Sequence, residues 1–226
     1  MTQFGVAQPV RRVEDPRLLK GGGSYTDDGT LPGMLHGVVL RSPHAMARIT
    51  ATDAAAARAV PGVLAVYTAA DIKADGIGLL PCLAKLNNRD GSPQISPDRP
   101  VLADGAVRHA GEPVAFVVAE TLQAARDGAE AVMVEYDQLP SITDLSAAMD
   151  AGQPQVWAQA PNNICFDWEI GQKEQVENLF AGAARITRLH VVNNCSLVNW
   201  IQPRAALASC YAEKRRSTLR TKTQGG

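Results

Sequence analysis

The chain has 226 residues, enough for one large or two modest domains. Hydrophobic residues make up 46% and charged residues 20%, so the chain can bury a core and is not disordered as a whole. A net charge of −1 argues against nucleic acid as the main partner, because phosphate binding needs a basic excess. No apolar run approaches the ~20 residues that cross a membrane, and the first nine residues do not resemble a secretory signal. We therefore expect a soluble, cytoplasmic protein without a membrane span.

The first half of the chain alternates short apolar strands with helical patches, and this pattern predicts two strand–helix–strand units in a mixed α+β domain of roughly 140 residues. The expected elements are a strand at 33–40, a helix at 54–59 capped by Asp53, a strand at 63–67, a helical turn near Ala69, a strand at 113–120, a helix capped by Thr121 and a strand at 132–137. Between the two units, residues 74–99 are rich in Gly, Pro and Asn and predict a long loop. We interpret it as an interface loop, with plain mobility as the alternative.

A short helix at 144–150 leads to Gly152-Gln153-Pro154, the clearest candidate for a domain boundary. We therefore expect one domain over residues 1–145 and the beginning of a second over 146–226. The second part predicts a helix with Val176, Leu179, Phe180 and Ala183 on one face, followed by strands at 185–192, 204–211 and 217–223. Because this part ends in strands without a closing helix, we expect it to be the opening of an incomplete domain.

The short motifs that carry chemistry do not reveal a function. The four cysteines are at least fifteen residues apart, so we expect reduced thiols and no iron–sulfur or structural zinc site; they are Cys82, Cys165, Cys195 and Cys210. Gly21-Gly22-Gly23 does not match the spacing of a phosphate-binding loop and predicts a tight turn. No two of the four histidines share a helical face, and for His44 and His109 hydrogen bonding is a better expectation than metal ligation. Nothing supports a serine or cysteine hydrolase.

Longer strings of sequence carry a resemblance that runs over nearly the whole chain and in order. They are RVEDPRLLKGGGSYTDD (12–28), GMLHGVVLRSPHAMARI (33–49), AVPGVLAVY (59–67), residues 111–136, NICFDWEIG (163–171), QPRAA (202–206) and TKTQGG (221–226). They closely resemble the large, molybdenum-binding subunit of the xanthine dehydrogenase/aldehyde oxidase family, in particular its bacterial carbon-monoxide-dehydrogenase-like branch.

The resemblance implies that the segment like residues 12–140 forms an α/β-hammerhead domain and that residues 155–226 begin a molybdopterin-binding domain. Members of the family oxidise an aldehyde, a nitrogen heterocycle or carbon monoxide with water as the oxygen source. The implied cofactor is molybdopterin with molybdenum, in the cytosine dinucleotide form. The implied partners are the remaining molybdopterin-binding region, an FAD-binding medium subunit and a 2Fe-2S small subunit.

One functional residue is implied by position. The family's T-Q-G or S-Q-N glutamine, which lies beside the molybdenum oxo group, matches Gln224. A neutral amide N–H can stabilise an oxo or hydroxo ligand without competing for protons. We therefore expect Gln224 to contact the cofactor, and the alternative is an exposed side chain at the end of a fragment.

Two departures from the family pattern limit this expectation. Gln202 stands where the branch commonly has a glutamate that could pair with Arg204. The family's catalytic glutamate and remaining pterin contacts match no residue of this chain, so we expect no catalytic residue and no metal ligand in it. The alternative functions are a non-catalytic hammerhead-type assembly module and an inactive gene fragment, and the substrate is not determined.

Overall fold

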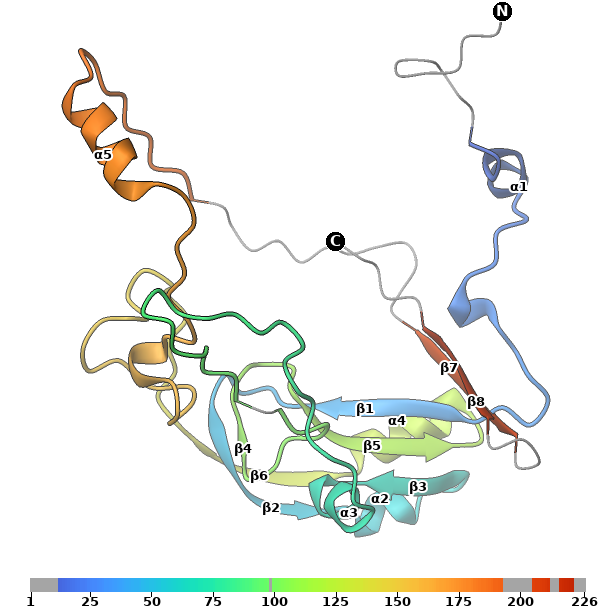
Figure 1. Ribbon diagram of the computed structural model, residues 1–226. Helices are drawn as coiled ribbons and strands as arrows, with labels where there is room; N and C mark the ends of the chain where they lie inside the picture. The colour runs from blue at the N-terminus through green and yellow to red at the C-terminus, as the bar shows by residue number, and fades with distance from the viewer. Residues whose placement is uncertain (1–11, 98, 193–204, 212–215, 222–226) are drawn as a thin grey trace, which may run out of the picture. The chain divides into compact units, whose positions relative to one another are not determined.

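The computed structural model describes residues 12–97, 99–192, 205–211 and 216–221 (Figure 1). By their internal contacts, residues 34–186 form one compact unit, and residues 1–33 and 187–226 form another. The larger unit contains, in chain order, β1 (His36–Arg41), β2 (Ala47–Asp53), α2 (Ala55–Arg58), β3 (Val63–Tyr67), α3 (Ala69–Ala74), β4 (Ala106–Val107), β5 (Pro113–Ala119), α4 (Leu122–Glu130), β6 (Met133–Gln138), the 3-10 turn η2 (Pro161–Asn163) and α5 (Lys173–Ala181).

The first sheet of this unit has the strand order β1-β5-β3, and both outer strands run antiparallel to β5. In register, Val38 and Val66 flank Val117 from opposite sides. Val117 is fully buried, as are Ala115 and Ala119 of the same strand. The continuous apolar run of β5 thus forms a central strand, as the sequence predicts, because both faces and both edges of it are covered.

Helix α4 packs against this sheet through its small residues. It begins after Thr121, whose hydroxyl accepts a hydrogen bond from the Ala124 N–H at 3.1 Å, so the predicted N-cap is confirmed. Ala125, Gly128 and Ala129 are buried, and they bring the helix close to the β-branched side chains of the sheet. The resulting core contains Ala54, Ala57, Val66, Ala115, Val117, Ala129 and Val132.

The second sheet has the order β4-β2-β6, with both pairs antiparallel. Its central strand, β2, is not among the elements expected above. Ala47 is buried and Ile49 is partly buried, and the later residues of the strand are exposed. Ala47, Ile49 and Ala51 alternate with polar residues, so the segment carries a short strand pattern that was missed, and it pairs with β4 and β6. A second core lies beside it, built from Ala47, Ala103, Val107 and Val114.

Two predicted elements are wrong. Residues 144–150 form turns instead of a helix, and the Asp144 carboxylate accepts a hydrogen bond from the Ser146 N–H at 2.8 Å, which stabilises a turn. Residues 185–192 form no strand; their apolar side chains are exposed and have no neighbouring strand to pair with among the described residues. The helix predicted around residues 176–183 is present as α5, but none of its residues is buried.

The smaller unit contains α1 (Asp15–Leu19), the 3-10 turn η1 (Thr26–Asp28) and an antiparallel hairpin of β7 (Ala206–Tyr211) and β8 (Arg216–Thr221). The glycine run closes α1: Gly21 has φ +73°, and the Gly22 N–H donates to the Arg17 carbonyl at 2.9 Å. The predicted tight turn is therefore confirmed. Glycine suits position 21 because it adopts a left-handed backbone conformation without strain. No helix among the described residues has the length and apolar character needed to cross a membrane.

A substitution at Gly128 would test the close packing of α4 against the first sheet. A Cβ at this position would lie 2.8 Å from Val63 Cγ2 and 2.9 Å from Val117 Cγ1, closer than real contacts allow. We expect Gly128→Ala to lower the free energy of unfolding by roughly 1–3 kcal/mol, even though alanine favours helix, because the core becomes overpacked. Urea unfolding of the full chain measures this change. Arg126→Ala, on the exposed side of α4, is the control, and an equal stability of both variants would contradict the expectation.

A substitution at Asp71 would test how the first turn of α3 is stabilised. Its carboxylate accepts hydrogen bonds from the Thr68 hydroxyl and the Thr68 N–H, both at 2.7 Å, and these bonds lower the pKa of Asp71 below its ordinary value of 3.8. Because the folded pKa is lowered, the stabilisation is complete above the unfolded pKa and is lost as pH falls through the folded value. Asp71→Asn should cost about 0.5–1 kcal/mol at pH 7, the lower part of the range for helix caps.

The measurement is urea unfolding of both proteins at pH 7 and near pH 3. At the lower pH the difference between the wild-type chain and Asp71→Asn should shrink. Asp150→Asn, a change at an exposed aspartate, controls for the removal of a negative charge. A difference that stayed constant with pH would show that the Asp71 carboxylate does not stabilise the helix start.

Candidate functional site

The predicted cofactor contact, Gln224, lies outside the described residues, as do Gln202 and Arg204. The role of Gln224 therefore stays a prediction. Within the described ranges, no three residues of the His, Cys, Asp and Glu types gather closely enough to hold a metal ion. Cys82 and Cys165 are exposed free thiols. The chemistry-bearing side chains of the larger unit form two other arrangements.

The first arrangement joins the turn after β1 to the loop before β5. The Arg41 guanidinium donates to the Gly111 carbonyl at 2.8 Å, and the Gly111 N–H donates to the Ser42 carbonyl, also at 2.8 Å. The Ser42 N–H donates to the Glu112 carbonyl at 2.9 Å. These bonds hold the RSPHA segment of the sequence, residues 41–45, against the loop at 108–112.

Ser42 is buried, and its hydroxyl is used to shape the turn. It accepts a hydrogen bond from the His44 N–H at 3.0 Å. The His44 ring makes an edge-on contact with the ring of Tyr136, with centroids 4.8 Å apart. Burial raises the pKa of the Tyr136 phenol, and a hydrogen bond with Ser42 opposes that shift. These contacts position backbone and rings, and they do not form an activated nucleophile.

Glu112 is the other buried polar residue of this arrangement, at 8% exposure. Its carboxylate accepts a hydrogen bond from the Arg108 N–H and lies 3.7 Å from His109 Nδ1. The Arg108 guanidinium in turn lies 3.9 Å above the Trp157 ring. His109 is therefore placed to pair with a carboxylate when it is protonated, in line with the expected polar contact and not with metal ligation.

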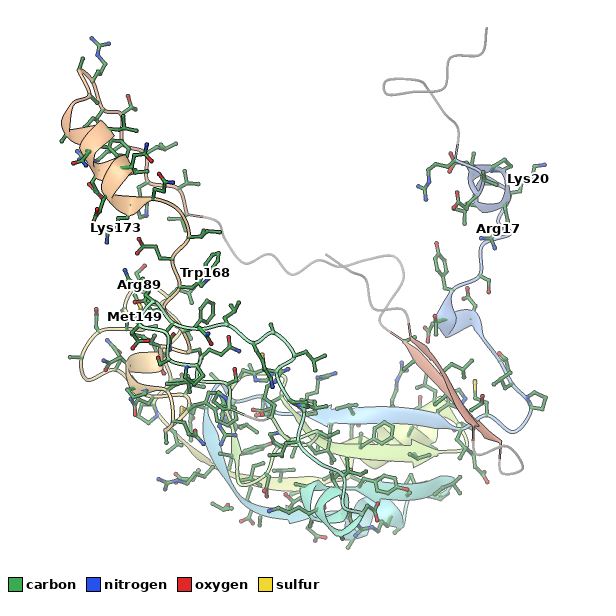
Figure 2. The ribbon with its side chains drawn as sticks, viewed as in Figure 1. Arg17, Lys20, Arg89, Met149, Trp168 and Lys173 are labelled. Atoms are coloured by element: carbon green, nitrogen blue, oxygen red, sulfur yellow. The ribbon has the colours of Figure 1, made fainter. Side chains whose placement is uncertain are left out.

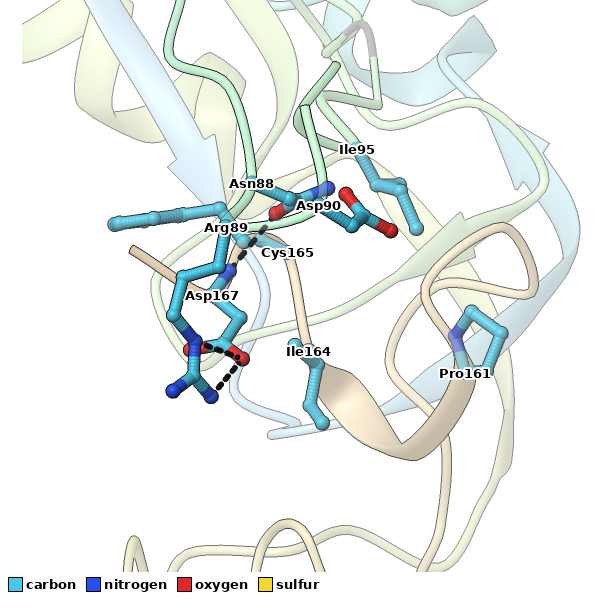
Figure 3. A pocket seen from close by; sticks show the side chains of 9 residues that line it. Asn88, Arg89, Asp90, Ile95, Pro161, Ile164, Cys165 and Asp167 are labelled. Atoms are coloured by element: carbon cyan, nitrogen blue, oxygen red, sulfur yellow. Dashed lines mark hydrogen bonds and ion pairs between the residues drawn. The ribbon is translucent and has the colours of Figure 1, made fainter. Parts of the chain in front are cut away.

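The second arrangement contains the loop predicted at 74–99. Apart from two isolated bridges, Leu80 with Arg99 and Asn87 with Pro93, its described residues form no regular structure beyond the end of α3. Part of this loop binds a segment about eighty residues later in the chain. An open hollow of about 330 Å³ lies between the two, lined by Asn88, Arg89, Asp90, Ile95, Pro161, Ile164, Cys165, Phe166 and Asp167 (Figure 3).

Arg89 is the central side chain of this contact. Its guanidinium bonds the Asp167 carboxylate from Nε at 3.0 Å and the Glu169 carboxylate from Nη1 at 2.9 Å. The two carboxylates raise the pKa of Arg89, hydrogen bonds to Asp167 being the largest cause. Next to it, the Ser92 hydroxyl and N–H lower the pKa of Asp90. All of these groups are exposed, so the contact fixes geometry more than it adds stability.

Sequence reasoning missed this contact, because ion pairs between residues 78 positions apart leave no local pattern. The one available signal was that NICFDWEIG belongs to the strings that carry the family resemblance. The 74–99 loop thus makes an intramolecular contact with this later segment, and its interpretation as an interface loop stays a prediction.

Comparison with known proteins gives the same family from sequence and from structure. Residues 20–140 match the family model of the aldehyde oxidase and xanthine dehydrogenase a/b hammerhead domain. The large chain of carbon monoxide dehydrogenase from Afipia carboxidovorans is 40% identical over 196 residues, which are 81% of this chain and 23% of that protein. The nicotine 6-hydroxylase large subunit of Paenarthrobacter nicotinovorans is 36% identical over 73% of this chain and 19% of its own length.

Solved structures agree. Quinoline 2-oxidoreductase from Pseudomonas putida 86 matches with a TM-score of 0.74 and 33% identity over 95% of this chain and 26% of its own. The Cu,Mo-CO dehydrogenase matches with a TM-score of 0.66 and 39% identity over 80% of this chain and 23% of its own. The chain thus spans about a quarter of the length of these relatives. Since the hammerhead model covers more than half of the chain and the fold agrees, the chain belongs to the aldehyde oxidase and xanthine dehydrogenase family and contains its α/β-hammerhead domain.

Proposed function

We propose that this chain acts as the N-terminal portion of the large subunit of a molybdenum hydroxylase, which oxidises an aldehyde, a nitrogen heterocycle or carbon monoxide with water as the oxygen source. The observation that carries the proposal is the match at 40% identity over 81% of the chain to a large chain of which it spans 23%. A segment with this coverage forms one part of a larger catalytic subunit. In this proposal it contributes the hammerhead domain and one cofactor contact, Gln224.

Among the described residues, the side chains of the buried polar groups Ser42 and Glu112 hold turns together, and no catalytic step is assigned to them. When bound to the complete subunit, molybdopterin, proposed here in its cytosine dinucleotide form, supplies the two-electron oxidation. Gln224 is the residue of this chain that we propose contacts it.

The proposed partners are the remaining molybdopterin-binding region, an FAD-binding subunit and a 2Fe-2S subunit, which carry electrons away from the molybdenum centre. Their proposed location, and that of this chain, is the cytoplasm. The rival function, a non-catalytic assembly module, shares the hammerhead domain but requires no molybdenum in any complex that contains the chain. Metal content therefore separates the two functions.

The metal content can be measured in a chimeric large subunit. The matched portion of the Afipia carboxidovorans large chain is replaced by this chain, and the chimera is produced with its partner subunits. We expect molybdenum in the purified chimera and no stoichiometric molybdenum in this chain produced alone in the same host, both measured by inductively coupled plasma mass spectrometry. Metal in the chain alone would contradict the proposal. A chimera that assembles with its partner subunits but lacks molybdenum would favour the assembly module.

The same chimera tests Gln224. If its amide stabilises developing charge at the metal centre, Gln224→Ala should lower the rate of carbon monoxide oxidation by about 10²-fold. Molybdenum content should stay the same, because the change removes one hydrogen bond and no metal ligand. Gln123→Ala, on the exposed side of α4, is the matched control and should keep the parent rate. An unchanged rate in Gln224→Ala would remove this residue from the site.

A further inference from the structure

Residues 164–170 form a segment whose apolar and polar side chains alternate. Cys165, Asp167 and Glu169 alternate with the apolar residues Ile164, Phe166, Trp168 and Ile170. Such alternation is typical of a strand with two different faces. The structure assigns no strand to these residues, but it pairs their backbone with another segment along one edge.

The bound edge faces the 86–95 part of the long loop. The Ile95 N–H donates to the Cys165 carbonyl at 2.8 Å, and the Arg89 N–H donates to the Asp167 carbonyl at 2.9 Å. The Asp167 N–H in turn donates to the Asn88 side-chain oxygen at 2.9 Å (Figure 3). Together with the Arg89 ion pairs, these bonds fix the backbone of the segment before anything else binds to it.

The other edge is open. In an extended chain, backbone groups of successive residues point to opposite sides, so the groups of Phe166 and Trp168 point away from those of Cys165 and Asp167. The N–H and C=O groups of Phe166 and Trp168 form no hydrogen bond with any described residue. The segment therefore offers backbone donors and acceptors in the spacing that a neighbouring strand requires.

The apolar side chains of the segment are exposed as well. Phe166 is 49% exposed, Trp168 52% and Ile170 80%. Figure 2 labels Trp168 on this segment, near Arg89. Large aromatic side chains gathered on a surface are the type that dominates binding energy when a partner covers them. Because the backbone beside these aromatic side chains is already held in place, less conformational entropy is lost when a partner binds. The open backbone edge and the exposed aromatic side chains thus lie in the same seven-residue segment.

We propose that the 164–170 segment is a docking strand for an extended apolar segment of the remaining large-subunit polypeptide, which adds to its open edge as a β-strand with Phe166 and Trp168 as anchors. This inference rests on the proposed function. The occupant follows from the extent of the relatives: more than three quarters of the Afipia carboxidovorans large chain lies outside the match and must contact this chain within one subunit.

The test uses the full chain and, as probe, the part of the Afipia carboxidovorans large chain that lies outside the match, produced together with it and carrying the affinity tag. We expect the unmodified chain to co-purify in a 1:1 complex. Phe166→Asp and Trp168→Asp should each lower the recovered chain about tenfold or more, because a charge would be buried at an anchor. Leu145→Asp, a change at another exposed apolar residue (80%), should leave recovery unchanged.

Hydrogen exchange provides a second measurement that does not depend on these variants. In the complex, the N–H groups of Phe166 and Trp168 should exchange more slowly than in the chain alone. The protection of β5 should be equal in all proteins, which shows that the variants fold. Arg89→Met should weaken the complex by loosening the bound edge, whereas Lys85→Met, at an exposed lysine of the same loop, should not.

The outcomes separate the two proposals. A complex that survives both aspartate variants, or that leaves Phe166 and Trp168 unprotected, overturns the docking strand and leaves the proposed function standing. Absence of any complex with the unmodified chain overturns both. A dimer of the chain alone that Phe166→Asp dissociates assigns the segment to self-association and likewise overturns the proposed occupant.

Discussion

The burial of β5 is the constraint on which the larger unit depends. This strand pairs with β1 and β3 along its edges, and α4 packs on the sheet. Ala115, Val117 and Ala119 are fully buried within it, while Val114 belongs to the second core. One strand thus links both cores, and the small residues Ala125, Gly128 and Ala129 of α4 allow the helix to approach it. The strands β1 and β3 and the helix α4 are placed by their contacts with this strand.

The loops around this core have two different physical tasks. At one place, buried polar groups are satisfied internally: Ser42 and Glu112 use their side chains on neighbouring backbone groups. Elsewhere, Arg89 holds the 164–170 segment through exposed ion pairs. In the first arrangement, side chains hold backbone turns together. In the second, one backbone edge is unpaired with any described residue and several apolar side chains are exposed, which fits a surface that another polypeptide covers.

This contrast bears on function. In a molybdenum hydroxylase, the catalytic centre needs residues that surround a large cofactor, and one domain of about a quarter of the subunit cannot provide them all. The described part of this chain has a sheet and helix core. Under the proposed function, this domain packs against other parts of a larger subunit, and its important surfaces are the ones that meet those parts.

The sequence by itself determined the strongly patterned elements and the family. The apolar run of β5, the Thr121 cap of α4 and the glycine turn after α1 are local signals, since each depends on residues within a few positions of one another. The ordered strings of sequence predicted the hammerhead fold. The site residue that they imply, Gln224, lies outside the described residues, so the sequence remains its only support.

Tertiary structure alone decided the rest. The alternation of Ala47, Ile49 and Ala51 with polar residues in β2 is compatible with a strand, but only the structure shows that β4 and β6 pair with it. The contact between Arg89 and Asp167 joins residues 78 positions apart. Such features depend on which segments meet in space, and local propensity cannot encode a partner that arrives from a distant part of the chain.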